Sequence, residues 1–139
     1  MTIAIDFDGT IVKHKYPEIG EPIQGAIDTI KALRENGHKI FLWTMRGSNR
    51  EYGRNLLAEA VEYLKENDIE LCGVNNSPHQ FSTSKKQYAN IYIDDASLGC
   101  PLFYLKDERP YVDWEMVGLY LVRMDLISEE QFKKIWPNH

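Results

Sequence analysis

The 139-residue chain has few cysteines, no long apolar segment and no excess of positive charge. Its two cysteines, Cys72 and Cys100, fit neither a CxxC pair nor the ligand spacing of a zinc site, which argues against a disulfide framework and predicts reduced thiols. No apolar run approaches the roughly 20 residues of a membrane span. The first residues do not form a basic region followed by an apolar signal segment. These absences predict a cytoplasmic protein without a membrane partner.

The formal net charge of -5 creates no field that attracts a polyanion to the whole surface. Nucleic acid is therefore the less favoured class of partner, although a local basic rim could still recruit it. A hydrophobic content of 43% fits a globular protein, and no repeat, low-complexity tract or linker divides the chain. We expect a single domain over residues 1–139.

Apolar runs typical of strands alternate with stretches of helical periodicity, which predicts an α/β fold with a central, mainly parallel sheet. The expected strands cover residues 2–5, 39–43, 71–74 and 90–93, with 101–105 as a candidate fifth. Helical spacing predicts one helix from about residue 23 to Gly37 and another over 56–67. Residues 107–139 are expected to form a helical segment packed on the domain, with helices starting near Asp113 and at the capping box of Ser128. Residues 11–23 fit a loop or a short hairpin, and residues 77–86 a mobile loop.

The segment Asp-Phe-Asp-Gly-Thr, residues 6–10, directly follows the first predicted strand. Alternation along a strand would place Asp6 and Asp8 on the same side. Gly9 permits a sharp turn behind them. Two neighbouring carboxylates are costly without a cation or a shared proton, and carboxylate oxygens suit Mg²⁺. One aspartate could then act as a nucleophile while the other transfers protons. The alternative is an acidic turn exposed to solvent.

Polar residues also follow two other strands. Thr44 comes after the second strand, and Asp94 and Asp95 come after the fourth. Because ligands of parallel sheets bind beyond the carboxyl ends of the strands, we expect these side chains to converge with Asp6. The three carboxylates would bind a metal, unless the acidic pair only caps a helix. Thr44 would donate to a phosphate oxygen, unless it only bonds its own backbone.

Three basic residues could contribute to such a site. Arg46 could contact phosphate through two hydrogen bonds, with a solvated surface arginine as the alternative. Lys85 and Lys86, shortly before the fourth strand, could neutralise the acidic residues, although most lysine pairs are simply solvated. The four histidines lack metal-ligand spacing and are interpreted as bystanders.

The motif at residues 6–10, the threonine after the second strand, the lysine and the final Ile-Asp-Asp together resemble the haloacid dehalogenase superfamily over residues 3–95. The resemblance implies a three-layer Rossmann-like fold. It also implies that Asp6 forms an aspartyl-phosphate. Asp8 would protonate the leaving oxygen, activate water and bind Mg²⁺ through its backbone carbonyl. The intervals between the motifs are too short for a cap domain. The chain therefore resembles small, capless, uncharacterised bacterial and phage members.

The resemblance further implies roles for the remaining site residues. Asp94 and Asp95 would complete the metal site, with Asp95 the expected direct ligand. Lys86, or else Lys85, would stabilise charge. The residues expected to contact the phosphorylated substrate are Gly9, Thr10, Thr44, Met45, Arg46 and Lys85.

The function predicted by the residues and the resemblance is a Mg²⁺-dependent phosphatase, a hydrolase of phosphoric monoesters. A phosphotransferase on the same fold and a non-catalytic phospho-ligand-binding regulatory protein are the alternatives. Residues 13–16, Arg46, Arg50 and the loop 77–86 are candidates for substrate specificity. Without a cap, a homo-oligomer could cover the site by placing one protomer against another.

Overall fold

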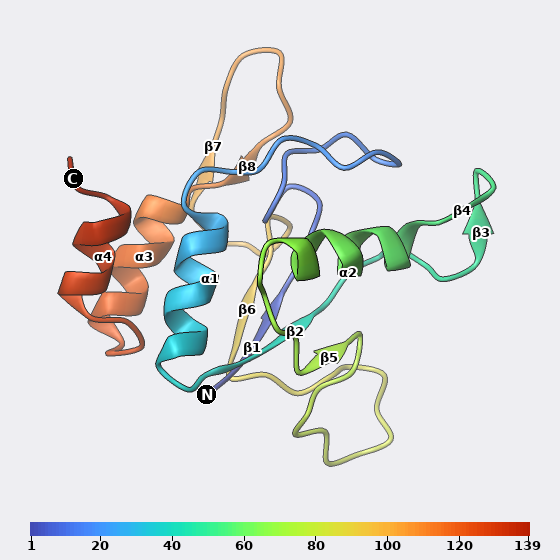
Figure 1. The fold of residues 1–139 in the computed structure, drawn as a ribbon, viewed down its shortest axis with the longest axis horizontal. Helices are drawn as coiled ribbons and strands as arrows, with labels where there is room; N and C mark the ends of the chain where they lie inside the picture. Colours follow the sequence, from blue (N-terminus) through green and yellow to red (C-terminus); the bar gives the residue numbers. More distant parts are fainter.

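A central four-stranded parallel sheet organises the molecule in the computed structural model, which describes residues 1–139 apart from the side chain of Glu51 (Figure 1). The strand order is β5-β2-β1-β6. The strands are β1 (Thr2–Ile5), β2 (Lys39–Leu42), β5 (Gly73–Val74) and β6 (Ile91–Ile93). Ile5 pairs in register with both Leu42 and Ile93. The carboxyl ends of the three adjacent strands β2, β1 and β6 are therefore level, and the residues that follow them emerge at one edge.

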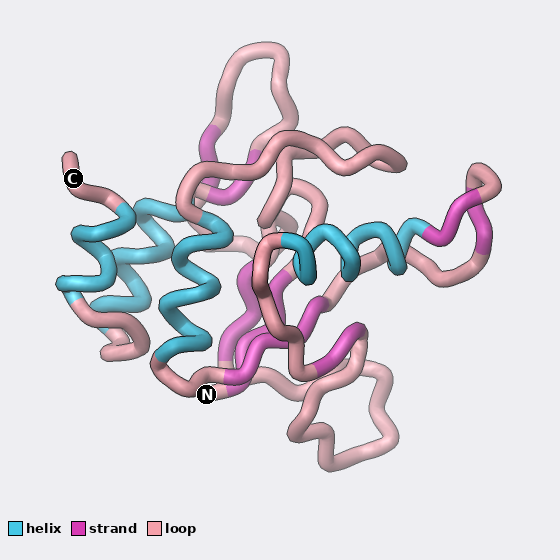
Figure 2. Tube along the Cα trace, viewed as in Figure 1, coloured by secondary structure: helices cyan, strands magenta, loops and turns pink.

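Four helices pack on the sheet or on one another, and the last of them contacts the first and the third (Figure 2). They are α1 (Ala26–Glu35), α2 (Leu56–Glu66), α3 (Trp114–Arg123) and α4 (Glu129–Ile135). The side chain of Asp113 caps α3 by accepting from two backbone N–H groups of its first turn. Ser128 and Gln131 form the predicted capping box of α4. None of the helices in the described chain is both long and apolar enough to cross a membrane.

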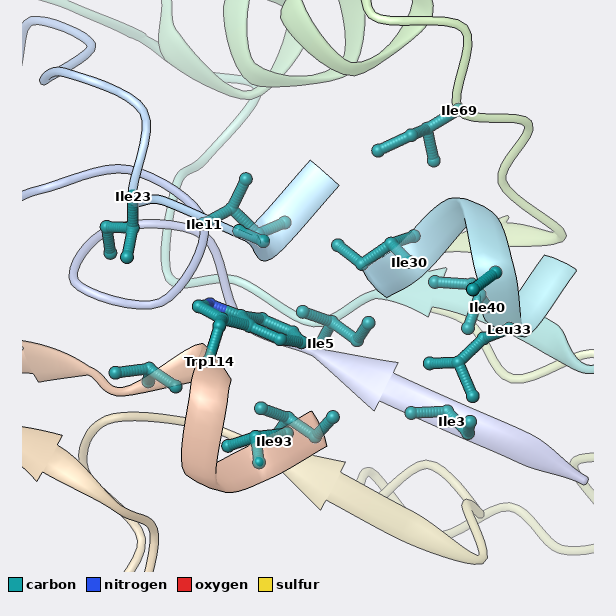
Figure 3. Packing of buried hydrophobic residues seen from close by; sticks show 14 of the residues in the cluster. Ile3, Ile5, Ile11, Ile23, Ile30, Leu33, Ile40, Ile69, Ile93 and Trp114 are labelled. Carbon is teal, nitrogen blue, oxygen red and sulfur yellow. The ribbon is translucent and has the colours of Figure 1, made fainter. Parts of the chain in front are cut away.

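The hydrophobic core lies between the helices and one face of the sheet (Figure 3). Ile3 and Ile5 are two residues apart on β1, so both side chains point toward this face, and both are fully buried. Trp114 at the start of α3 is also fully buried, and its indole N–H donates to the carbonyl of Thr10 at 2.6 Å. That bond fixes the first helix of the C-terminal segment to the loop that follows β1.

The opposite face of the sheet is contacted by the irregular connection from β5 to β6, residues 75–90. The Thr2 hydroxyl lies 2.6 Å from His79 Nδ1, and the Thr2 backbone N–H donates to the side chain of Asn90. Tyr92 donates its hydroxyl proton to the carbonyl of Gln87. The helices therefore form one layer and the sheet a second. The other face of the sheet is contacted by the irregular connection of residues 75–90, at the position where a third layer of helices was expected.

Two small antiparallel pairs extend the molecule beyond the central sheet (Figure 1). One joins β3 (Arg50–Glu51) to β4 (Arg54–Asn55), and the other joins β7 (Leu102–Phe103) to β8 (Tyr111–Val112). The run at 101–105 was a candidate fifth strand of the main sheet, and it pairs with β8 instead. Residues 11–23 adopt the hairpin-like alternative, since Val12 bridges to Pro22 and the Lys13 N–H donates to Glu21. The two antiparallel pairs and the segment of residues 11–23 all project on the side where the strands of the central sheet have their carboxyl ends (Figure 1).

Candidate active site

Three carboxylates meet at the carboxyl edge of the sheet. Asp6 directly follows β1, and Asp94 and Asp95 directly follow the neighbouring strand β6. One oxygen from each lies within 4.8 Å of the others. This is the convergence that strand order predicts, because parallel neighbours in register end at the same level. Such a set of oxygen donors fits a hard divalent cation such as Mg²⁺.

Burial and mutual repulsion change the protonation of these carboxyl groups. Burial, followed by the charge of Asp94, raises the pKa of Asp6 from its ordinary value of 3.8 to about 8. Burial also raises the pKa of Asp94, and the neighbouring Asp95 adds to this rise. Without a cation, the cluster therefore retains a proton near neutral pH. A bound divalent cation would favour the ionised form of Asp6, which is the nucleophilic form.

Thr10 and Gly9 connect the two strand ends. The Thr10 hydroxyl donates to Asp6 Oδ2 at 2.9 Å and accepts the backbone N–H of Asp95 at 3.1 Å. Thr10 is fully buried, so its side chain links the loops rather than facing an incoming substrate. Gly9 has a φ of +82°, and a Cβ there would lie 2.4 Å from Asp95 Oδ2. The glycine therefore permits the approach of the acidic pair to the first motif.

Asp8 does not face the same point as Asp6, contrary to the prediction from strand alternation. Its carboxylate oxygens accept two hydrogen bonds from Arg46, each of 2.8 Å. Among the described residues, the acidic cluster contains Asp6 but not Asp8. The alternation rule fails here because β1 ends at Ile5 and the chain then turns. Because the Asp8 carboxylate is bonded to Arg46, only the backbone carbonyl of Asp8 could make the predicted contact with a metal ion.

Arg46 is neither a surface arginine nor a free phosphate ligand. Its guanidinium is fully buried and lies between the rings of Phe7 and Tyr16. Besides the two bonds to Asp8, it donates to the carbonyls of Pro17, Glu18 and Leu56. These contacts use all five N–H donors of the guanidinium. Arg46 therefore ties the first motif to the loop 11–23 and to the start of α2.

Thr44 and Met45 follow β2 at the same edge. The Thr44 hydroxyl accepts the backbone N–H of Arg46 at 3.1 Å, so the turn-forming alternative is realised, while its own proton stays available to a ligand. The Met45 side chain is almost completely exposed. Asn75, directly after β5, accepts the Thr44 N–H at 2.9 Å and was missed. The strand-end rule that singled out Thr44 would have identified it.

Lys85 and Lys86 do not reach the carboxylates. Both are exposed, and the Lys86 ammonium lies 5.7 Å from the centre of the Tyr92 ring. Within the described chain, neither lysine forms an ion pair with the acidic cluster. Their loop is folded around the Gln80 amide, which donates to three backbone carbonyls. This loop precedes β6 and contacts the amino end of β1, whereas the carboxylates follow β6.

His14 belongs to the site, although its sequence spacing suggested a bystander. Its Nε2 lies 2.8 Å from Asp95 Oδ2, across 81 residues of sequence. Spacing rules could not detect this contact because it depends on the path of the loop after Gly9. Elsewhere, Cys72 and Cys100 are free thiols, and both are half-buried.

Comparison with solved structures gives an informative match. No family model matches the sequence, and no curated protein matches it. A solved structure of a conserved protein from Bacteroides thetaiotaomicron is 35% identical in sequence, with a TM-score of 0.68. The match covers 94% of this chain and 95% of the Bacteroides chain. This chain therefore belongs to the same family as that conserved Bacteroides protein.

Proposed function

We propose that the protein is a Mg²⁺-dependent phosphoester hydrolase of the haloacid dehalogenase type, without a cap domain, in which Asp6 is the nucleophile. The observation that carries the proposal is the convergence of Asp6, Asp94 and Asp95 at the carboxyl edge of the parallel sheet. A cluster of partly buried, ionised carboxylates is unfavourable unless a cation or a shared proton compensates it. Its position directly beyond the ends of the two neighbouring strands β1 and β6 is where α/β folds bind ligands.

The hydrogen bonds distinguish the two adjacent aspartates. Asp95 has a protein partner at each oxygen, with His14 at 2.8 Å and Thr10 at 3.5 Å. The Asp94 carboxylate accepts the Ala96 N–H at Oδ1, and its other side-chain hydrogen bond is with the neighbouring Asp95. We therefore assign Asp6 and Asp94 as the direct ligands and Asp95 as the supporting residue, which reverses the expectation for the pair. Mg²⁺ would neutralise the cluster and the phosphate that approaches it.

The proposed chemistry proceeds through two displacements at phosphorus. An ionised oxygen of Asp6 attacks the phosphorus atom, the bond from phosphorus to the leaving oxygen breaks, and an aspartyl-phosphate forms. Water then gives a proton to the Asp8 carboxylate and attacks the phosphorus, the bond from phosphorus to Asp6 breaks, and inorganic phosphate leaves the free Asp6 carboxylate. The Thr44 hydroxyl proton is available to a phosphoryl oxygen. For Asp8 to protonate the leaving oxygen, its carboxylate must first detach from Arg46.

That last requirement favours one second candidate, a phospho-ligand-binding protein with little or no turnover. An aspartate held at both oxygens by a fully buried guanidinium is poorly placed to transfer protons. If this pair never opens, the site still binds a cation and a phosphate but lacks its acid and base.

A phosphoester panel with and without Mg²⁺ separates the two candidates. The panel should include aryl phosphates, sugar phosphates, nucleotides and phosphopeptides. We expect hydrolysis that excess chelator abolishes and Mg²⁺ restores. Asp6→Asn should remove turnover without unfolding the protein. Asp28→Asn, the same change at an exposed position of α1, should leave turnover unchanged. Full activity in chelator, or normal turnover by Asp6→Asn, would exclude the mechanism, and phosphate binding without hydrolysis would support the binding protein.

A further inference from the structure

His14 makes a largely enclosed polar contact at the edge of the acidic cluster. Its side chain is 13% exposed and that of Asp95 is 17% exposed. Because a carboxylate oxygen accepts, the ring N–H at Nε2 is the donor in their 2.8 Å contact. Among the described residues, the atoms close enough to share one ion come from Asp6, Asp94 and Asp95, and His14 is not among them. The histidine therefore lies behind the acidic cluster rather than within it.

The backbone is shaped to allow this contact. At Gly9, a Cβ would lie 2.1 Å from His14 Nε2 as well as against Asp95, and no side chain fits at that distance. The next residue, Thr10, is fully buried and accepts the Asp95 N–H. The indole N–H of Trp114 donates a hydrogen bond to the backbone carbonyl of Thr10. The loop from Gly9 to His14 is thus folded closely around one carboxylate.

We propose that His14 is a positioning residue of the metal centre: it fixes Asp95 so that Asp6 and Asp94 are presented to the cation. The inference rests on the cation of the proposed function but not on turnover. Residues that hold metal ligands and their neighbours in orientation commonly change metal affinity 10–100-fold when they are removed. Without His14, Asp95 would lose its shortest side-chain hydrogen bond and keep the longer, 3.5 Å contact with Thr10, beside two other carboxylates.

Calorimetric titration with Mg²⁺ and Mn²⁺ tests the proposal directly. The proteins compared are the wild type, His14→Ala, His14→Gln and His79→Ala, each verified as folded by circular dichroism at the titration temperature. We expect the dissociation constant of His14→Ala to rise about 10- to 100-fold. His14→Gln, whose amide N–H can still donate, should recover part of this loss. His79→Ala is the matched control, since His79 pairs with Thr2 at the other end of β1.

A second readout separates positioning from a general structural role. If the protein hydrolyses an ester, His14→Ala should need more Mg²⁺ for half-maximal activity but approach the wild-type kcat at saturating Mg²⁺. A folded His14→Ala protein with the wild-type dissociation constant would overturn the proposal, and so would a wild type that binds neither cation. If the wild type binds the cation but cleaves no ester, the proposed function fails and the role of His14 stands.

Discussion

Asp6→Asn is expected to stabilise the cation-free protein at neutral pH while removing the proposed nucleophile. In the folded wild type, burial and Asp94 raise the pKa of Asp6 to about 8, against 3.8 for an unperturbed side chain. Between these two pH values the folded protein holds a proton that the unfolded chain has released. The free energy of unfolding therefore falls as the pH rises through this window. Asparagine does not ionise, so the variant lacks this dependence.

The size of the effect follows from the linkage between proton binding and folding. Each pH unit inside the window costs about 1.4 kcal/mol, so raising the pH from 5 to 7 removes about 3 kcal/mol of stability. For a chain of this length, 1 kcal/mol corresponds to about 4 °C in Tm. The wild type should thus lose roughly 10 °C that Asp6→Asn does not lose. Burial lowers the pKa of His38, so this residue makes the free energy of unfolding rise with pH. Both proteins contain His38, and its contribution therefore cancels in the difference between their Tm values.

The assay is thermal unfolding followed by circular dichroism, in excess chelator, at pH 5, 6 and 7. The quantity of interest is the difference in Tm between the two proteins at each pH, which should widen as the pH rises. Adding Mg²⁺ at pH 7 should raise the Tm of the wild type more than that of Asp6→Asn, because the cation binds the ionised carboxylate. Parallel Tm curves for the two proteins in chelator would refute the assignment of a strongly raised pKa to Asp6.

Three further predictions concern the rest of the molecule. Arg46→Met should lower the free energy of unfolding by about 3–5 kcal/mol in urea titrations, because it leaves the Asp8 carboxylate without its buried partner; a loss below about 1 kcal/mol would contradict this. Ser128→Ala should cost about 1 kcal/mol by removing the capping box of α4, and an unchanged urea midpoint would speak against that. Size exclusion with light scattering should give the mass of a dimer or tetramer, and the exposed Tyr120 and Leu98 are the candidate interface residues. A strict monomer at micromolar concentration would contradict the prediction of an oligomer.

Local sequence patterns located most of the regular elements. The helical periodicity over 56–67 predicted α2, which ends at Glu66, and the Ser128 motif predicted the start of α4. These predictions succeed because helical periodicity and capping depend on residues within one or two turns of each other. The β3–β4 pair was missed, since two-residue strands have no pattern of their own.

The sequence alone also determined the centre of the candidate site. Asp6, Asp94 and Asp95 each follow an apolar strand, and parallel pairing brings strand ends together whatever the loops do. The same argument placed Thr44 at this edge. The same does not apply to Lys86, which comes before β6. A residue before a strand lies toward the amino end of that strand, whereas the acidic residues after β6 lie at its carboxyl end.

Only the tertiary structure decided how the side chains around this centre are arranged. Asp8 turns away from Asp6 to meet Arg46, 38 residues later, once the chain leaves the extended conformation of β1. His14 meets Asp95 because the loop after Gly9 folds back onto the end of β6. Both contacts join segments whose approach depends on the path of irregular loops and on how tightly they are buried. No periodicity in the sequence encodes that path, so the strand ends were predictable and their partners were not.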